Sequence, residues 1–211
     1  DAEEWWAAMC ETTRAIFSAG AVEPEQVAGI SFCSQMQGLV LVDQSGNTVR
    51  RPMSYMDQRA GEELRRGIAY GPRIAGANIR KLLTSLRLTG AVSSSVKDPL
   101  WKYKWVEAHE PEAFSRVWKW LDVKEYLILR CTSQAVMTRD SAYATFLYDT
   151  RPGRQCWSGA LCRMFGVQPE HLPRLADAAE LVGGLTDQAA AELGLAPGTP
   201  VFGGGGDASL I

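Results

Sequence analysis

The stretch Pro200-Val201-Phe202-Gly203-Gly204-Gly205-Gly206-Asp207 is the most informative part of this chain. Its three apolar residues predict a short strand that runs into a turn. Glycine has no Cβ, so it adopts φ of either sign and lets the backbone approach another group closely. Four consecutive glycines are costly to order and therefore indicate a place from which side chains are excluded. With Asp207 at its end, the run favours phosphate chemistry in which this carboxylate acts as a base or a metal ligand. The alternative is a flexible linker that ends on an ordinary surface carboxylate.

The size and composition of the chain are those of a globular protein. Its 211 residues allow one large domain or two small ones, and they are enough to bury a core. Apolar residues make up 46% and charged residues 22%, and the net charge is −2. The sequence contains no basic block, signal pattern or apolar run of membrane-spanning length. It therefore predicts neither a nucleic-acid partner nor a membrane.

The cysteines and histidines do not form a recognisable metal or catalytic pattern. The five cysteines are an odd number and lie far apart, at Cys10, Cys33, Cys131, Cys156 and Cys162. The spacing of the last two is too long for a CxxC motif, and neither His109 nor His171 lies near them. A zinc site or a Cys/His pair is therefore disfavoured, and we predict no metal ligands of this kind. Reduced cysteines in a cytoplasmic protein are the simpler interpretation.

The first fifty residues predict a helix, a strand and a hairpin. Residues 3–19 have the apolar spacing of an amphipathic helix, and 27–33 form a buried strand. Two further strands, over 39–43 and 48–50, flank the turn residues 44–47. This pattern indicates an antiparallel hairpin after the first strand.

The middle of the chain predicts mostly helices. Pro99 is a favourable first residue for a helix over 99–109, with Asp98 as its N-cap. Asp122 and Asp140 are predicted to cap two further helices. The remaining helices are expected over 60–69, 75–84, 110–114, 154–165 and 187–193, with a short strand over 117–120. Strands near both ends with helices between them indicate an α/β domain, and the hairpin makes its sheet mixed.

Aromatic residues are dense in the segment 99–109, which contains Trp101, Tyr103 and Trp105. Such a cluster can stack on the ring of a sugar. The same spacing more often packs between helices, and we favour a core.

Two polar segments follow predicted strands. Ser34-Gln35-Met36-Gln37-Gly38 offers two amides, each of which donates and accepts hydrogen bonds, as a polyhydroxylated ligand requires. Met56-Asp57-Gln58-Arg59 offers a carboxylate and a guanidinium in a loop led by Pro52. Either segment alone is explained as well by a hydrogen-bonded loop. Strand ends of an α/β sheet are, however, where ligands gather, so together the segments favour a site.

Several motifs in order resemble the FGGY carbohydrate kinases, which include xylulose, gluconate and glycerol kinases. The motifs are Gly29-Ile30-Ser31, SQMQGLVLVDQSGN (34–47), RRPMSYMDQRA (50–60), the segment 122–130, TRDSAYAT (138–145) and GLAPGTPVFGGGGD (194–207). The resemblance extends over essentially the whole chain.

The resemblance implies a ribonuclease-H-like (actin-like ATPase) α/β fold with a mixed sheet and surrounding helices. Residues 1–211 are expected to form most of the N-terminal, substrate-binding domain. The first strand with its phosphate loop and a C-terminal ATP domain are expected outside this chain, which alone should not turn over substrate efficiently. The implied cofactors are ATP and Mg²⁺. The implied partner is a small sugar, and a homodimer is compatible with the family.

The resemblance also implies roles for individual residues. Asp207 matches the catalytic base, and Gly204, Gly205 and Gly206 would lie near phosphate. The substrate-binding residues would be Gln35, Met36, Gln37, Asp57, Arg59 and Arg87.

Departures from the family pattern lie near the sugar. Gln37 replaces a histidine of xylulose kinases, Tyr55-Met56 replaces a tryptophan-containing form, and Ala208 follows the base where many relatives have Asn or Gln. The reaction type is therefore better defined than the sugar.

Three functions follow from these motifs. The first is ATP-dependent phosphorylation of a sugar or polyol, with a ketopentose such as D-xylulose as the favoured substrate. The second is a non-catalytic sugar-binding or regulatory module of the same fold. The third, a metal nuclease, requires a cluster of carboxylates around two metals and ranks last, because Asp207 has no obvious acidic partners in the sequence.

Overall fold

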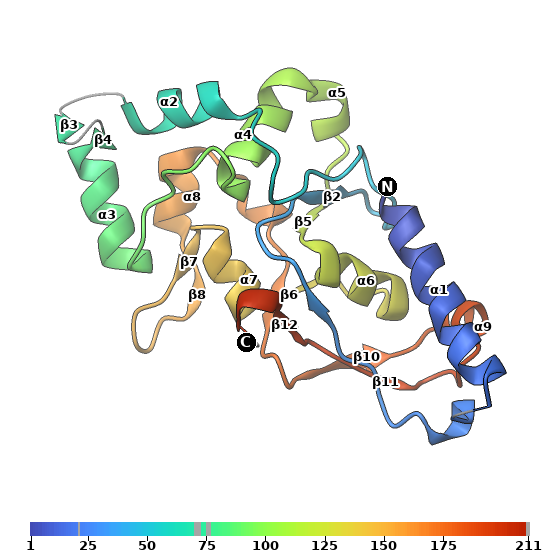
Figure 1. Ribbon diagram of the computed structural model, residues 1–211. Coiled ribbons are helices and arrows are strands. Elements are labelled where there is room, and N and C mark those ends of the chain that lie inside the picture. Colours follow the sequence, from blue (N-terminus) through green and yellow to red (C-terminus); the bar gives the residue numbers. More distant parts are fainter. Residues whose placement is uncertain (21, 70–72, 75–76, 210–211) are drawn as a thin grey trace.

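The computed structural model describes residues 1–211 apart from 21, 70–72, 75–76 and 210–211 (Figure 1). The helices are α1 (Ala2–Ser18), α2 (Gly61–Ala69), α3 (Ile79–Thr89), α4 (Pro99–His109), α5 (Pro111–Phe114), α6 (Val123–Thr132), α7 (Arg139–Ala144), α8 (Gly159–Phe165) and α9 (Asp187–Leu193). The strands are β1 (Cys33–Ser34), β2 (Val40–Val42), β3 (Arg73–Ile74), β4 (Ala77–Asn78), β5 (Lys119–Leu121), β6 (Val136–Thr138), β7 (Tyr148–Asp149), β8 (Cys156–Trp157), β9 (Arg174–Ala176), β10 (Leu181–Gly184), β11 (Pro200–Phe202) and β12 (Gly205–Gly206).

The strands pair in both directions, as predicted for a mixed sheet. β1 pairs with β12 and β6 with β9 in parallel, whereas β2–β5, β3–β4, β7–β8 and β10–β11 are antiparallel. A parallel bridge between Ile30 and Val201 extends the first pairing. The chain around Ile30–Ser34 therefore runs beside 200–206, although the two lie far apart in the sequence.

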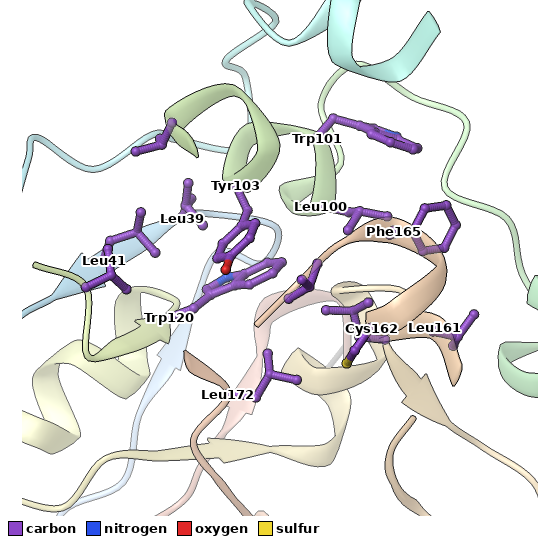
Figure 2. Packing of buried hydrophobic residues seen from close by; sticks show 14 of the residues in the cluster. Leu39, Leu41, Leu100, Trp101, Tyr103, Trp120, Leu161, Cys162, Phe165 and Leu172 are labelled. Atoms are coloured by element: carbon purple, nitrogen blue, oxygen red, sulfur yellow. The ribbon is translucent and has the colours of Figure 1, made fainter. Parts of the chain in front are cut away.

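Trp101 and Tyr103 of α4 belong to the core, as the sequence favoured, whereas Trp105 is partly buried against it. Trp101, Tyr103 and Trp120 are each at most 1% exposed. The ring of Tyr103 stacks on that of Trp120 with centroids 5.0 Å apart, and Leu39 and Leu41 pack nearby (Figure 2). These rings are covered by protein and offer no surface to a sugar.

A second core lies under the strands that carry the glycine run. Trp6 of α1, Ile128 of α6 and Leu193 of α9 pack with Val136 and Val201. α1 lies beside α9, while α2 and α3 occupy the opposite end of the molecule (Figure 1). Of the helices in the described ranges, none has the length and apolar character needed to cross a membrane.

Helix boundaries follow the sequence more closely than strand boundaries. The helices over 60–69, 99–109 and 187–193 lie within one residue of α2, α4 and α9. The predicted strand over 27–33 is instead the bridge at Ile30 followed by β1. The hairpin turn forms, but 48–50 contributes only a bridge from Thr48 to Val42.

Two helix predictions need correction at their N-termini. The segment 154–165 begins with β8, and α8 starts only after Ser158, whose hydroxyl accepts a hydrogen bond from the Leu161 N–H. The helix expected over 75–84 starts at Ile79, after Asn78 caps it. Residues 75–76 lie outside the described residues.

Of the three predicted aspartate caps, Asp98 and Asp122 occupy the N-cap positions of α4 and α6, and only Asp140 is wrong. Asp122 accepts a hydrogen bond from the Val123 N–H at the start of α6, as predicted. Asp98 is the N-cap residue of α4, although its carboxylate accepts hydrogen bonds from Ser93 Oγ and the Ser95 N–H in the preceding loop and none from the helix itself. The N-cap residue of α7 is Thr138, and Asp140 is the second residue of the helix, in its first turn.

The glycine run excludes side chains because it passes against the protein's own backbone. Gly204 has a φ of +68°, and a Cβ there would overlap the backbone of Phe32. A Cβ on Gly203 would lie 2.5 Å from the carbonyl oxygen of Asp177. The run is therefore a packed segment of the fold, and a flexible linker is excluded.

Gly204→Ala should destabilise the chain far more than Gly20→Ala. Both glycines have a φ of +68°, but nothing lies within 4 Å of a Cβ on Gly20. Left-handed backbone alone costs about 1–2 kcal/mol, so Gly20→Ala measures that term. Gly204→Ala adds overlap with backbone, and we expect a total of at least about 3 kcal/mol. Urea denaturation of both variants tests this, and equal losses would contradict the close approach.

Candidate active site

A hollow of about 590 Å³ lies at the end of the glycine run. Three segments line it: 35–37 after β1, 143–146 at the end of α7, and 207–209 after β12, with Tyr55 and Ala91 at other points. β1 and β12 are parallel, with Ser34 opposite Gly206. Their carboxyl ends therefore meet at one edge, and this register brings Gln35 and Asp207 together.

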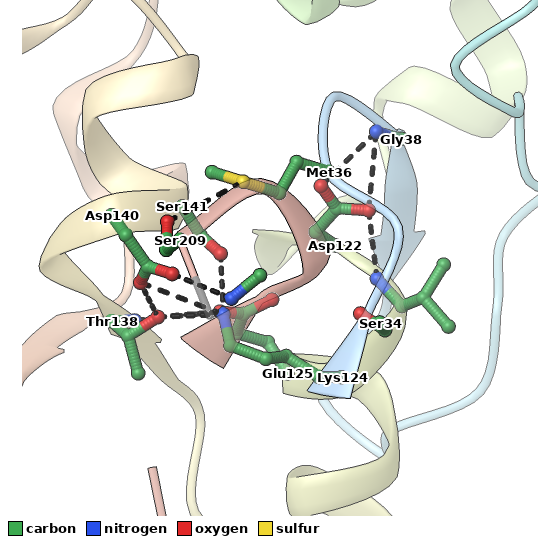
Figure 3. A network of polar contacts seen from close by, with 12 residues as sticks. Ser34, Met36, Gly38, Asp122, Lys124, Glu125, Thr138, Asp140, Ser141 and Ser209 are labelled. Atoms are coloured by element: carbon green, nitrogen blue, oxygen red, sulfur yellow. Dashed lines mark hydrogen bonds and ion pairs between the residues drawn. The ribbon is translucent and has the colours of Figure 1, made fainter. Parts of the chain in front are cut away.

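The loop after β1 is tied to the first turn of α6. Both carboxylate oxygens of Asp122 accept the Gly38 N–H, at 3.1 and 3.0 Å (Figure 3). A Cβ on Gly38 would overlap Asp122, so only glycine fits here. Burial and the nearby carboxylate of Glu125 raise the pKa of Asp122 to about 7.

Lys102 holds the same loop from α4. Its Nζ donates to the carbonyl oxygens of Gln37 and Ser54, both at 2.8 Å. The lysine is fully buried. Burial lowers the pKa of Lys102 to about 8, although the negative charges of Asp57, Asp122 and Asp98 act to raise it. One ammonium thus joins the polar segment 34–38 to the loop that leads into the second polar segment, 56–59.

Backbone strain gathers at the hollow. The described chain holds four non-glycine residues at positive φ, and two of them, Gln37 at 65° and Phe146 at 63°, line this hollow. Such conformations persist only where the surroundings impose them, and they cluster at functional sites. The bond from Lys102 to the Gln37 carbonyl is one such restraint.

Asp207 presents an exposed carboxylate to the hollow. One oxygen accepts the N–H of Ala208 at 2.8 Å, which orients the group within a short 3₁₀ turn over Asp207–Ser209. Ser209 and Met36 meet across the hollow, with Oγ 3.8 Å from the sulfur.

Three of the predicted substrate-binding residues do not line this hollow. Asp57 and Arg59 pair with each other, with Arg59 Nε 3.0 Å from both carboxylate oxygens. The guanidinium of Arg59 also lies over the ring of Trp105, 4.9 Å from its centroid. Arg87 is an exposed residue of the last turn of α3. Only Asp57 reaches the site indirectly, through its charge near Lys102.

The glycines before Asp207 are buried for a different reason from the one the sequence suggested. A Cβ on Gly206 would overlap the side chain of Met36, and one on Gly204 would overlap Phe32. The space beside these two glycines, where a side chain would lie, is filled by the protein itself.

Sequence reasoning missed several residues of the site. Tyr143 and Phe146 line the hollow, and Lys102 holds the carbonyl of Gln37, another lining residue. Asp140, predicted as a helix cap, instead accepts the N–H of Gly206 at 2.6 Å. The motif that contains Asp140 and Tyr143 was visible in the sequence, but nothing there showed that α7 faces the glycine run.

The fold and the hollow define the class of protein. Helices around short parallel and antiparallel strands, with a hollow at strand ends, make an α/β domain with one candidate ligand site at this edge. Residues 1–210 match the model of the FGGY family of carbohydrate kinases, N-terminal domain. The chain belongs to the FGGY family of carbohydrate kinases.

Individual relatives agree with this assignment. The chain is 28% identical over 206 residues to the xylulose kinase of Bacillus subtilis (strain 168), covering 97% of the chain and 38% of the relative. It is 30% identical over 208 residues to a xylulose kinase of Staphylococcus epidermidis, covering 98% and 38%. The chain therefore spans well under half the length of these relatives.

Solved structures share the fold. The crystal structure of xylulose kinase from Rhodospirillum rubrum superposes with a TM-score of 0.83 at 24% identity, covering 99% of this chain and 41% of that one. Gluconate kinase from Lactobacillus acidophilus gives 0.79 at 22% identity, covering 100% and 40%.

The buried amine of Lys102 should make stability depend on pH. Its pKa is about 8 in the folded protein, against 10.5 for an ordinary lysine. Between these values the unfolded chain binds more protons than the folded chain, so the free energy of unfolding rises with pH. We expect Lys102→Met to lose this rise when both proteins are unfolded chemically between pH 7 and 10. A stability difference that is independent of pH would contradict the burial of a charged amine here.

Proposed function

We propose that the full-length protein transfers the γ-phosphoryl group of ATP to a hydroxyl of a sugar or polyol, with a ketopentose such as D-xylulose as the first candidate. The observation that carries this proposal is the convergence of Asp207 with Gln35 and Gln37 on one hollow. Family membership and the xylulose kinases among the relatives support the reaction and the substrate class.

Asp207 would act as the general base. A hydroxyl bound at the strand ends would give its proton to the exposed carboxylate as its oxygen attacks the γ-phosphorus. Phosphoryl transfer depends mainly on alignment and charge neutralisation, so a fixed carboxylate within hydrogen-bond reach is what the chain must supply. The amides of Gln35 and Gln37 would bind neighbouring hydroxyls, because each amide donates and accepts.

We propose ATP as the second substrate and Mg²⁺ as its counterion, which would neutralise phosphate charge when bound. Mg²⁺ in such enzymes is held largely by phosphates and waters. Within the described ranges no three His, Cys, Asp or Glu side chains gather into a metal-binding group.

We propose that residues 1–211 form most of a substrate-binding domain and that an ATP-binding domain completes the enzyme. A cytoplasmic location and a homodimer stay predictions.

Asp207→Ala in the full-length protein should lower kcat for ADP production by about 10³-fold, since general bases contribute about 10²–10⁴-fold. Asp187→Ala is the matched control, because it removes an exposed carboxylate from the first turn of α9. A panel of sugars and polyols, read by ADP release, names the substrate in the same assay. Undiminished turnover by Asp207→Ala would remove this residue from the mechanism. Sugar binding by calorimetry without any ADP release would favour the non-catalytic module.

Gln35→Ala should raise the KM for the sugar by about tenfold, the loss of one or two hydrogen bonds of about 0.5–1.5 kcal/mol each. Arg87→Ala should change KM by less than about twofold, because this exposed side chain does not line the hollow. Steady-state kinetics at saturating ATP measures both. A larger effect at Arg87 than at Gln35 would place the sugar elsewhere.

A further inference from the structure

The last backbone hydrogen-bond donor before Asp207 is bound by a side chain. Gly206 N–H donates to Asp140 Oδ2 at 2.6 Å. The preceding residues are held by backbone partners, with Gly205 N–H on the Phe32 carbonyl at 3.0 Å and Gly204 N–H on the Ala178 carbonyl at 2.8 Å. β12 ends at Gly206, and the chain turns at Asp207. Asp140 therefore fixes the peptide from which the carboxylate of Asp207 projects.

Asp140 is itself held by a buried cation. Lys124 of α6 is 1% exposed, and its Nζ lies 3.9 Å from Asp140 Oδ1 (Figure 3). The same Nζ donates to Thr138 Oγ1 at 2.6 Å and to the hydroxyl of Ser141. Thr138 Oγ1 also binds Asp140.

The charges around this group keep Asp140 ionised. Partial burial acts to raise the pKa of Asp140. The charge of Lys124 and the hydrogen bonds from Thr138 and the Gly206 N–H together outweigh this effect, so the pKa lies below its ordinary value. Lys124 also pairs with Glu125, which is fully buried. A buried charge without a partner is expensive, so these groups constrain one another's positions.

Asp140 also belongs to the wall of the hollow through its helix. α7 carries Tyr143 and Ala144, which line the hollow, one turn after Asp140. Helix α7 thus lines the hollow and, through Asp140, also binds the Gly206 peptide that precedes Asp207.

We propose that Asp140, held by Lys124, is a positioning residue that aims the carboxylate of Asp207 at the reacting hydroxyl. This rests on the proposed role of Asp207. Because Asp140 acts on the base rather than on the sugar, its removal affects kcat and leaves sugar affinity nearly intact. A misplacement of about 1 Å in a reacting group can cost about 100-fold in rate.

The test uses Asp140→Ala and Asp140→Asn in the full-length protein. Asparagine keeps an oxygen that accepts the Gly206 N–H, so it should rescue part of the loss. We expect kcat to fall by about 10–100-fold in the alanine variant and by less in the asparagine variant, with the KM for the sugar within about twofold of wild type. Hydrogen exchange of the peptide over 200–209 should be faster in the alanine variant.

Asp149→Ala is the matched control. Asp149 is a buried aspartate that, like the partly buried Asp140, accepts a backbone N–H, from Arg151 at 3.1 Å, but it does not line the hollow. It should lower thermal stability without lowering kcat. This control distinguishes a fall in kcat caused by lower stability from one caused by a misplaced Asp207 carboxylate.

A double-mutant cycle distinguishes the two proposals. If Asp140 acts through Asp207, Asp140→Ala has no further effect on the residual rate of Asp207→Ala. Full kcat in Asp140→Ala, or a rise in KM alone, would overturn the positioning role while the base stands. Full kcat in Asp207→Ala would overturn both.

Discussion

The parallel pairing of the chain around Ile30–Ser34 with 200–206 is the constraint on which the rest of the site depends. Its register sets Ser34 opposite Gly206, so the residues that follow, Gln35 and Asp207, emerge at the same edge. The pairing is close enough that a Cβ on Gly204 would overlap the backbone of Phe32. The glycine run is therefore required first by strand packing, and the proximity of amide and carboxylate is its consequence.

The first turn of α6 braces both halves of this edge. Asp122 holds the Gly38 N–H after one strand, and Lys124, two residues later, lies beside Asp140, which holds Gly206 on the other strand. Burying these charges costs free energy that apolar side chains would not cost. What they add is direction, because hydrogen bonds and ion pairs fix the angle of a loop in a way that apolar contacts do not. Lys102 performs the same task from α4 for Gln37.

The sequence predicted the elements whose signals are local. Helix α4 begins at a proline and helix α9 follows a capping threonine, and the predicted bounds of both helices, 99–109 and 187–193, were correct. Strands of two to four residues carry weaker signals, so β6, β9 and β10 were missed and 27–33 was predicted too long. Asp207 and the two glutamines, which the motifs singled out, line one hollow. Asp140 was misassigned as a cap because its partner, Gly206, is 66 residues away in the chain. Long-range partners of this kind are decided by tertiary packing.

The proposed site requires that the carboxylate of Asp207 and the amides of Gln35 and Gln37 hold one substrate between them. A crystal structure of the full-length protein with D-xylulose and a non-hydrolysable ATP analogue tests it most directly. We expect one sugar hydroxyl within about 3 Å of an Asp207 oxygen and facing the γ-phosphate, with neighbouring hydroxyls on the two amides. A sugar bound with every hydroxyl more than about 6 Å from Asp207, well beyond that reach, would contradict it.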